Sequence, residues 1–148
     1  MSFLSKLLPQ RSGSPRKIIG TMHPFTSAAL LLVPPETYEH DDTRMKRVLM
    51  FLFGALDALI QQQRITGEAM YRTLETYLTL AFPSMSADEL QHAITFLTDA
   101  SADPAWTPIM QRGGQTMADW LRGDSVAPSR LVKIVEYGMD DHDATRNA

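Results

Sequence analysis

The four histidines of the chain are too far apart in the sequence for any two of them to form a local metal site together. No two of them are four residues apart, the spacing that places two imidazoles on one face of a helix. They are His23, His40, His92 and His142. The chain has no cysteine, which excludes disulfides, thiolate nucleophiles and cysteine-ligated zinc sites. A metal site in this chain would therefore need histidines and carboxylates that the fold brings together.

Two short runs combine carboxylates with a histidine. EHDD covers Glu39–Asp42, and DDHD covers Asp140–Asp143. Oxygen-rich runs can hold a cation weakly, but tight binding needs ligands that converge from a rigid frame. Helix capping accounts for Asp41 and Asp42, and a solvated tail accounts for the second run. We therefore expect no metal site and no cofactor.

The common catalytic signatures are absent: there is no G-x-G-x-x-G, Walker loop, H-E-x-x-H, G-x-S-x-G or EF-hand loop. We therefore expect a protein that is not an enzyme. One alternative rests on Asp57, the single charge between Val48 and Ile60. A carboxylate in apolar surroundings must find a donor or become neutral. We expect Asp57 at the rim of the core or in a structural pair, whereas a pocket around it would suit a small enzyme.

The apolar run around Asp57 predicts the central helix of the fold. Thirteen residues at 1.5 Å each span about 20 Å, short of the roughly 30 Å of a bilayer core. A helix that is apolar on every face is usually surrounded by other elements. We expect it to begin near Asp42 or Thr43 and to end near Arg64.

Four further helices follow from periodicity and capping signals. The second is capped by Thr66 and ends before Pro83, and the third opens with the capping box SADE at Ser86. The fourth begins at Pro108 and contains Gly113 and Gly114, which predict a kink or the close approach of another backbone. The last lies between Pro128 and Gly138.

These patterns predict an all-α fold, a compact bundle of about five helices with a central apolar helix and an irregular N-terminal arm. Apolar residues make up 44% of the 148 residues and charged residues 21%, which suits one folded domain. We expect a flexible basic arm over residues 1–20, a helical domain over 21–138 and an acidic, frayed tail over 139–148. Residues 28–33 predict a short buried helix or an extended segment laid on the core.

Charge is distributed unevenly around a net value of −3. Residues 1–20 contain Lys6, Arg11, Arg16 and Lys17 without any acid. Two solvated tails of opposite sign explain this pattern, while a basic arm that contacts an acidic partner or phosphates is the alternative. Because Lys6 and Pro9 interrupt the apolar part of the N-terminus, a secretory signal is not indicated and we expect a cytoplasmic protein.

Residues 115–138 have the outline of a helix-turn-helix, with Gly123 in the turn and Arg130 and Lys133 on a possible recognition helix. Against this interpretation, Pro128 crowds the second helix and the basic residues do not cluster into a phosphate-binding face. We keep a DNA-binding regulator as an alternative and expect nucleic acid not to be the partner. The tripeptide RGD, Arg122–Asp124, fits a helix end, and we set aside an adhesion role.

The passage QQRITGEAMYRTLETYLTLAFPSMSADELQHAI, residues 62–94, is similar in layout to the helical TerB-like domains. In that family a loop with an acidic-Gly pair precedes an Ile and then a Glu that opens the next helix. Here Gln62 and Gln63 stand in place of the acidic-Gly pair. No metal role is carried over to this chain.

The hypothesis that remains is a helical protein–protein interaction module of bacterial type: an adaptor, a chaperone for another protein, or an immunity-like inhibitor. Nine methionines and two tryptophans support it, since both residue types are common at binding surfaces. An exposed side of the apolar helix would also favour a homodimer. The residues that we expect to bind a partner are Phe51, Phe53, Phe96, Trp106, Met110 and Trp120.

Overall fold

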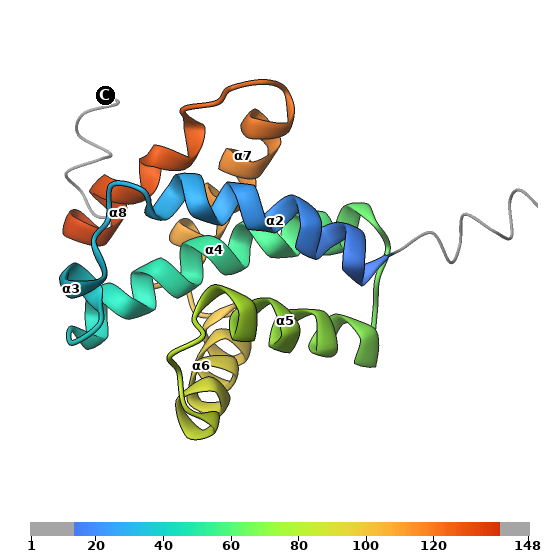
Figure 1. Cartoon of the computed structure of the whole chain (residues 1–148), viewed down its shortest axis with the longest axis horizontal. Coiled ribbons are helices and arrows are strands. Elements are labelled where there is room, and N and C mark those ends of the chain that lie inside the picture. Colours follow the sequence, from blue (N-terminus) through green and yellow to red (C-terminus); the bar gives the residue numbers. More distant parts are fainter. Residues whose placement is uncertain (1–13, 140–148) are drawn as a thin grey trace, which may run out of the picture.

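The computed structural model describes residues 14–139, and this part of the chain contains α-helices and one 3₁₀ turn but no strand (Figure 1). The all-α prediction is therefore confirmed. The helices are α2 (Pro15–Leu30), α3 (Pro35–Tyr38), α4 (Asp42–Gln62), α5 (Glu68–Ala81), α6 (Ala87–Ala100), α7 (Thr107–Leu121), η1 (Ala127–Arg130) and α8 (Leu131–Tyr137). The five expected helices correspond to α4 to α8, and α2 and α3 are additional.

Helix α4 lies at the centre of the fold, as its apolar sequence predicts. It contacts α2, α3, α5, α6, α7 and α8, and Figure 1 shows it running lengthwise between the α7–α8 side and the α5–α6 side. Ten of its residues are buried: Val48, Leu49, Met50, Phe51, Leu52, Gly54, Ala55, Leu56, Leu59 and Ile60. No helix in residues 14–139 is both long and apolar enough to span a membrane.

Glycines permit a close contact between the backbones of α4 and α7. A Cβ atom added to Gly54 would overlap the backbone carbonyl of Met110, and one added to Gly113 would overlap that of Phe51. A Cβ on Gly114 would stand 3.4 Å from the carbonyl oxygen of Gly54. The Gly113–Gly114 pair thus serves the close approach of a neighbouring backbone, one of the two outcomes that its position in a helix predicts.

Helix α2 begins at Pro15, inside the segment that the sequence predicts to be a flexible arm, and residues 1–13 of that segment lie outside the described residues. Ser14 caps the helix by accepting a hydrogen bond from the backbone N–H of Lys17, and a proline suits the first helical position. Ile18 and Met22 are buried in the core. The prediction of a flexible segment up to residue 20 is therefore wrong for residues 15–20. Pro24 lies inside α2.

Residues 28–33 are only partly buried, in contrast to the expected buried segment. They form the end of α2 and the turn that follows it. Leu31 and Leu32 are 79% and 65% exposed, whereas Val33 is buried. The turn is needed because Pro34 and Pro35 start the next helix, and a residue before proline is disfavoured in the helical conformation.

The capping signals of the sequence are confirmed at two helix starts. At α4, the backbone N–H of Arg44 donates to Asp41 Oδ1 at 3.0 Å. At α6, the Glu89 N–H donates to Ser86 Oγ at 3.1 Å, and the Ser86 N–H donates to Glu89 Oε1 at 2.8 Å. The start of α5 differs from the prediction, because Gly67 with φ of +64°, and not Thr66, occupies the cap position.

A buried hydrogen bond joins α2 to α5. The hydroxyl groups of Thr26 and Tyr77 are 2.7 Å apart, and both residues are buried. Burial raises the pKa of Tyr77 far above its usual range, and the hydrogen bond with Thr26 opposes that rise only in part. The fold therefore holds Tyr77 in its neutral form.

We predict opposite effects of alanine at two kinds of helical glycine. Gly54→Ala and Gly113→Ala should each lower the free energy of unfolding by at least about 2 kcal/mol, because the new methyl group meets backbone atoms that cannot move aside. Gly20→Ala, at an exposed position with nothing within 4 Å, should raise it by about 1 kcal/mol. Urea denaturation measures all three. Equal effects at the three positions would contradict the described α4–α7 contact.

We predict that Tyr77 makes stability fall at alkaline pH. The unfolded chain ionises tyrosine near pH 10, while the folded chain keeps the Tyr77 proton, so stability is complete below pH 10 and declines above it by up to about 1.4 kcal/mol per pH unit. Tyr77→Phe should cost about 1 kcal/mol at pH 8 and should remove this decline. Tyr71→Phe, at an exposed tyrosine, is the control and should leave the decline in place.

Candidate functional site

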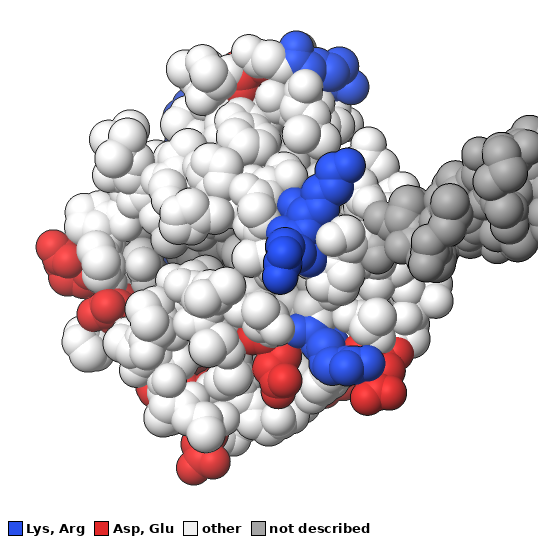
Figure 2. Space-filling view, turned by 45° about the vertical axis from the view of Figure 1, so that its right-hand side comes forward, with Lys and Arg blue, Asp and Glu red and all other residues white. Residues whose placement is uncertain are grey.

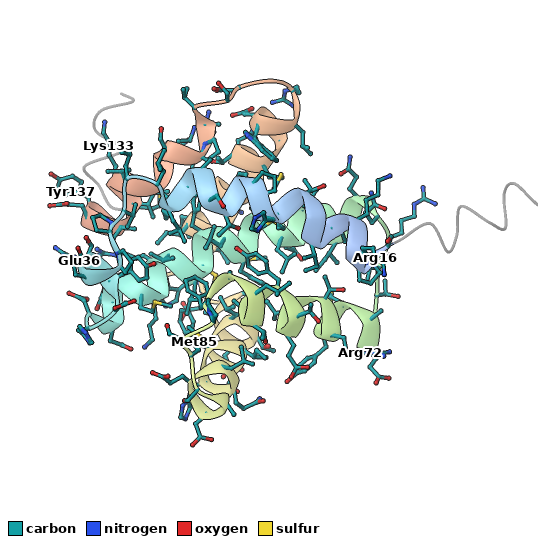
Figure 3. All side chains as sticks on the ribbon, in the orientation of Figure 1. Arg16, Glu36, Arg72, Met85, Lys133 and Tyr137 are labelled. Atoms are coloured by element: carbon teal, nitrogen blue, oxygen red, sulfur yellow. The ribbon has the colours of Figure 1, made fainter. Side chains whose placement is uncertain are left out.

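Two adjoining cavities, of about 410 and 510 Å³, form one groove between the α3–α4 connection and α6. Both cavities are lined by Glu39, His40, Met45, Met85 and Glu89, so they are continuous. We call this feature the acidic groove. Met85, labelled in Figure 3, lies beside α6 between the α5 and α3–α4 sides of the molecule.

The lining of the acidic groove is apolar at its base and acidic at its rim. Met45 and Leu49 of α4, Met85 and Phe96 supply apolar surface. The carboxylates around it are Glu39, Asp41, Asp42 and Glu89, and Lys46 is the one Lys or Arg side chain among the lining residues. An apolar base within a negatively charged rim suits a ligand that is both apolar and cationic.

Helix capping holds two of these carboxylates in place. Asp41 caps α4, and Glu89 belongs to the capping box that opens α6. The hydrogen bonds from Ser86 lower the pKa of Glu89, the backbone N–H being the largest cause. Asp42 forms an ion pair with Lys46 at 2.9 Å, one turn further along α4. The groove therefore keeps its negative rim in neutral solution.

His40 and His92 are both exposed at the acidic groove. Together with EHDD they bring several metal-ligand residue types to one place. Even so, in residues 14–139 no three His, Asp or Glu side chains are arranged in a way that could hold a metal ion. The second acidic run, Asp140–Asp143, lies outside the described residues.

Phe96 and Trp106 pack edge to face at one side of the acidic groove. Their ring centroids are 5.2 Å apart and the rings are nearly perpendicular, at 87°. The ammonium group of Lys46 lies 5.3 Å from the centroid of Phe96, within the range of a cation–π contact. These contacts join α6, the start of α7 and α4 at the groove wall.

The six residues expected to bind a partner do not form one surface. Phe51 is fully buried and stacks near Phe25, at 6.3 Å between centroids, and Trp120 packs against the same phenylalanine at 5.4 Å. Phe51 therefore belongs to the core, and its prediction as a contact residue is wrong for the folded monomer. The other five are partly buried: Phe53, Phe96, Trp106, Met110 and Trp120. Of the six, only Phe96 lines the groove.

Asp57 lies at the rim of the core and is half-buried. Its Oδ2 accepts a hydrogen bond of 2.6 Å from Gln61 Nε2, one turn further along α4. Burial raises the pKa of Asp57, and the hydrogen bond from Gln61 opposes this in part. The donor is thus a neutral side chain on the same helix, and of the two expected positions for Asp57 the rim of the core is the one observed.

Arg130, the main basic residue of the helix-turn-helix interpretation, is engaged within the molecule. Its Nη2 lies 2.8 Å from Asp119 Oδ2, and its Nη1 donates to Thr116 Oγ1 at 3.3 Å. The hydrogen bond from Arg130 is the first cause that lowers the pKa of Asp119. Lys133 is exposed on α8 (Figure 3).

The RGD tripeptide takes part in the turn after α7. Arg122 pairs with Asp119, and Gly123 has a φ of +108°, a conformation that favours glycine. Asp124 Oδ1 accepts a hydrogen bond of 3.2 Å from the backbone N–H of Val126. All three residues therefore shape the exit from the helix.

A second groove, of about 540 Å³, lies between α2 and α5. Its lining is mostly apolar, with Ile19 and Ala69 among its residues, and Arg16 and Arg72 stand at its edge (Figure 3). Figure 2 shows this end of the molecule, where a few Lys and Arg side chains stand in a largely uncharged surface and acidic side chains adjoin the lowest of them. This second groove has arginines and no carboxylate in its lining, and it shares no lining residue with the acidic groove.

Sequence reasoning identified EHDD but missed the groove that it borders. The missing walls come from residues 81–96, which lie about 40 positions further along the chain. The capping box was the available signal, since it fixes a carboxylate at the start of α6. Nothing local indicated that this carboxylate would face EHDD.

Comparisons of this chain with protein-family models, with curated proteins and with solved structures found no match. The similarity of residues 62–94 to TerB-like domains gains no support from these comparisons.

We predict that Asp57→Asn raises the free energy of unfolding at pH 7, by less than about 1 kcal/mol. The raised pKa means that the fold favours the protonated carboxyl group of Asp57 over the charged one. The stability that the protonated group contributes is complete below the pKa of the unfolded chain and is lost as pH rises through the pKa of the folded chain. The gain should shrink on acidification towards pH 3. Exposed Glu75→Gln, which also removes one negative charge, is the control. A loss of stability at pH 7 would contradict a rim carboxylate and indicate a structural pair.

Proposed function

We propose that this protein is a non-enzymatic helical interaction module whose acidic groove binds a segment of another protein. An adaptor, a chaperone for another protein and an immunity-like inhibitor all work in this way. The observation that carries the proposal is the combination of a methionine and aromatic base with a carboxylate rim in one open groove. This composition is typical of surfaces that bind amphipathic peptide segments.

The apolar base supplies a reason for binding. Met45 and Met85 have flexible side chains that can adapt to a ligand, and the edge-to-face pair of Phe96 and Trp106 stabilises one wall. Met45, Met85 and Phe96 are each partly buried against the core, so their remaining surface is available at the groove. Covering that surface with apolar side chains removes it from water and favours association.

The acidic rim supplies selectivity for the partner. Carboxylates on one side of a groove attract a cationic segment from a distance of about 10 Å at 0.1 M salt and repel an acidic one. Because Asp41 and Glu89 are held by backbone N–H groups, little ordering of the rim is needed when a ligand binds. The partner that fits is a basic amphipathic segment.

The alternatives depend on residues that the fold uses in other ways. A DNA-binding regulator needs a free guanidinium at Arg130, which instead pairs with Asp119. An enzyme based on Asp57 needs a second functional group beside it, and the described contact of its carboxylate is with Gln61. No observation in residues 14–139 favours either alternative over the groove. A cytoplasmic location remains part of the proposal.

We predict that capture of a partner depends on the acidic groove. Full-length tagged protein should retain one stoichiometric protein from its native cell extract, before and after nuclease treatment. Glu39→Lys combined with Met85→Lys should reduce that recovery at least tenfold, since it reverses one rim charge and places another in the apolar base. The measurement is quantitative mass spectrometry of the retained material, with circular dichroism to verify that the variant is folded.

The matched control is Glu75→Lys combined with Leu80→Lys. Both positions are exposed on α5 and neither lines the groove, yet the change in charge is the same. This control should retain the partner as the wild type does. Recovery that is lost with nuclease, or that is equal in both double variants, would contradict the proposal.

A further inference from the structure

We infer that the acidic groove binds the basic N-terminal segment, residues 1–13, of a second copy of this chain. The inference rests on the proposed function, because it uses the same groove, and it names one occupant. The segment reads MSFLSKLLPQRSG and lies outside the described residues. Three features of the molecule support it: charge, apolar pattern and reach.

Charge complementarity is the first feature. The segment contains Lys6 and Arg11 and no carboxylate, and Arg16 and Lys17 extend its positive charge into the first turns of α2. Four carboxylates border the acidic groove, and Lys46 is already paired with Asp42 at 2.9 Å. Glu39 is exposed at the junction of both cavities, where it can pair with a cation from outside. The positive charges of the segment therefore meet the negative charges of the groove.

The apolar pattern of the segment is the second feature. Leu4, Leu7 and Leu8 have the spacing that places three side chains on one face of a helical turn, while Lys6 falls away from that face. A turn this short is marginal alone in water and needs a surface to pack against. The base of the groove, with Met45, Met85 and Phe96, offers such a surface. An order that forms on binding is common for segments of this kind.

Reach distinguishes a second copy from the same chain. Pro15 stands at one end of α2, while α3 follows the other end, about 24 Å away for sixteen helical residues (Figure 1). The α3–α4 connection, which comes next, lines the groove. From Ser14 back to Leu8 a fully stretched backbone spans at most about 22 Å. Leu8 of the same chain therefore cannot reach the groove, so Leu4, Leu7 and Leu8 cannot pack in it together. A neighbouring copy has no such restriction.

Reciprocal exchange of the two segments produces a two-fold dimer in which each groove is filled by the partner's arm. The sequence suggested a dimer that would cover an exposed side of the apolar helix, but Phe51 of that helix is fully buried within the monomer. Exchange of the N-terminal segments gives a different basis for a dimer. It also makes the arm a competitor of any external ligand for the same groove. Self-association and capture of another protein should therefore oppose each other.

The test measures the dissociation constant of the full-length dimer by sedimentation equilibrium. The wild type should dimerise, and raising the salt from 0.05 to 0.5 M should weaken the dimer at least tenfold. The arm variant, Lys6→Glu with Arg11→Glu, and the groove variant, Glu39→Lys with Met85→Lys, should each be at least tenfold weaker than the wild type. The surface control, Glu75→Lys with Leu80→Lys, should match the wild type.

Mixing the arm variant with the groove variant is the decisive experiment. In the mixed dimer the unchanged arm meets the unchanged groove, and the acidic arm meets a groove whose lining carries equal numbers of carboxylates and lysines. One full contact is thereby restored, so the mixed dimer should be at least about threefold tighter than the dimer of either variant alone. This recovery also proves that both variants are folded. A wild-type chain that stays monomeric, or a mixture that does not recover, overturns the inference. The proposed function would still stand if the groove variant alone fails to capture a partner from extract.

Discussion

The rest of the structure depends on the contact between the backbones of α4 and α7. Gly54 meets the carbonyl of Met110, and Gly113 meets that of Phe51, so each helix presents a missing side chain to a carbonyl of the other. A hydrogen on each glycine Cα atom points towards a carbonyl oxygen, the geometry of the weak Cα–H···O contacts found between helices. Side chains would hold the two axes further apart. The crossing point is therefore determined by backbone atoms.

This crossing places the remaining helices around α4. Lys46 and Arg47, which are adjacent near the start of α4, contact different parts of the molecule. Lys46 faces Phe96 at the acidic groove, while Arg47 Nη1 donates to the carbonyl oxygens of Val135 and Glu136, at 3.0 and 3.3 Å. These are last-turn carbonyls of α8 that lack partners within the helix, so Arg47 closes the C-terminal end of the fold. One helix thereby connects the packed core with the open groove.

Sequence patterns predict what depends on neighbours along the chain. The start of α4 at Asp42, the capping box at Ser86 and the role of Gly113 follow from local chemistry and are confirmed. Helix α2 was not predicted, and it contains Pro24, whose position removes one helical hydrogen bond and crowds the carbonyl group four residues earlier. That loss is tolerated here because the helix buries Ile18, Met22 and Phe25 on one side. Burial in the tertiary structure is not visible in a local pattern.

The groove could not be predicted for a related reason, since its walls come from separate segments. Its physical character nevertheless follows from capping, because Asp41 and Glu89 are fixed by the helix starts that need them. Carboxylates held in this way stay in position without a ligand and need no metal ion to order them. Replacing either one would weaken a helix as well as the rim, which confounds stability with binding. Glu39 has no capping role at α4 or α6, so its substitution separates the two effects.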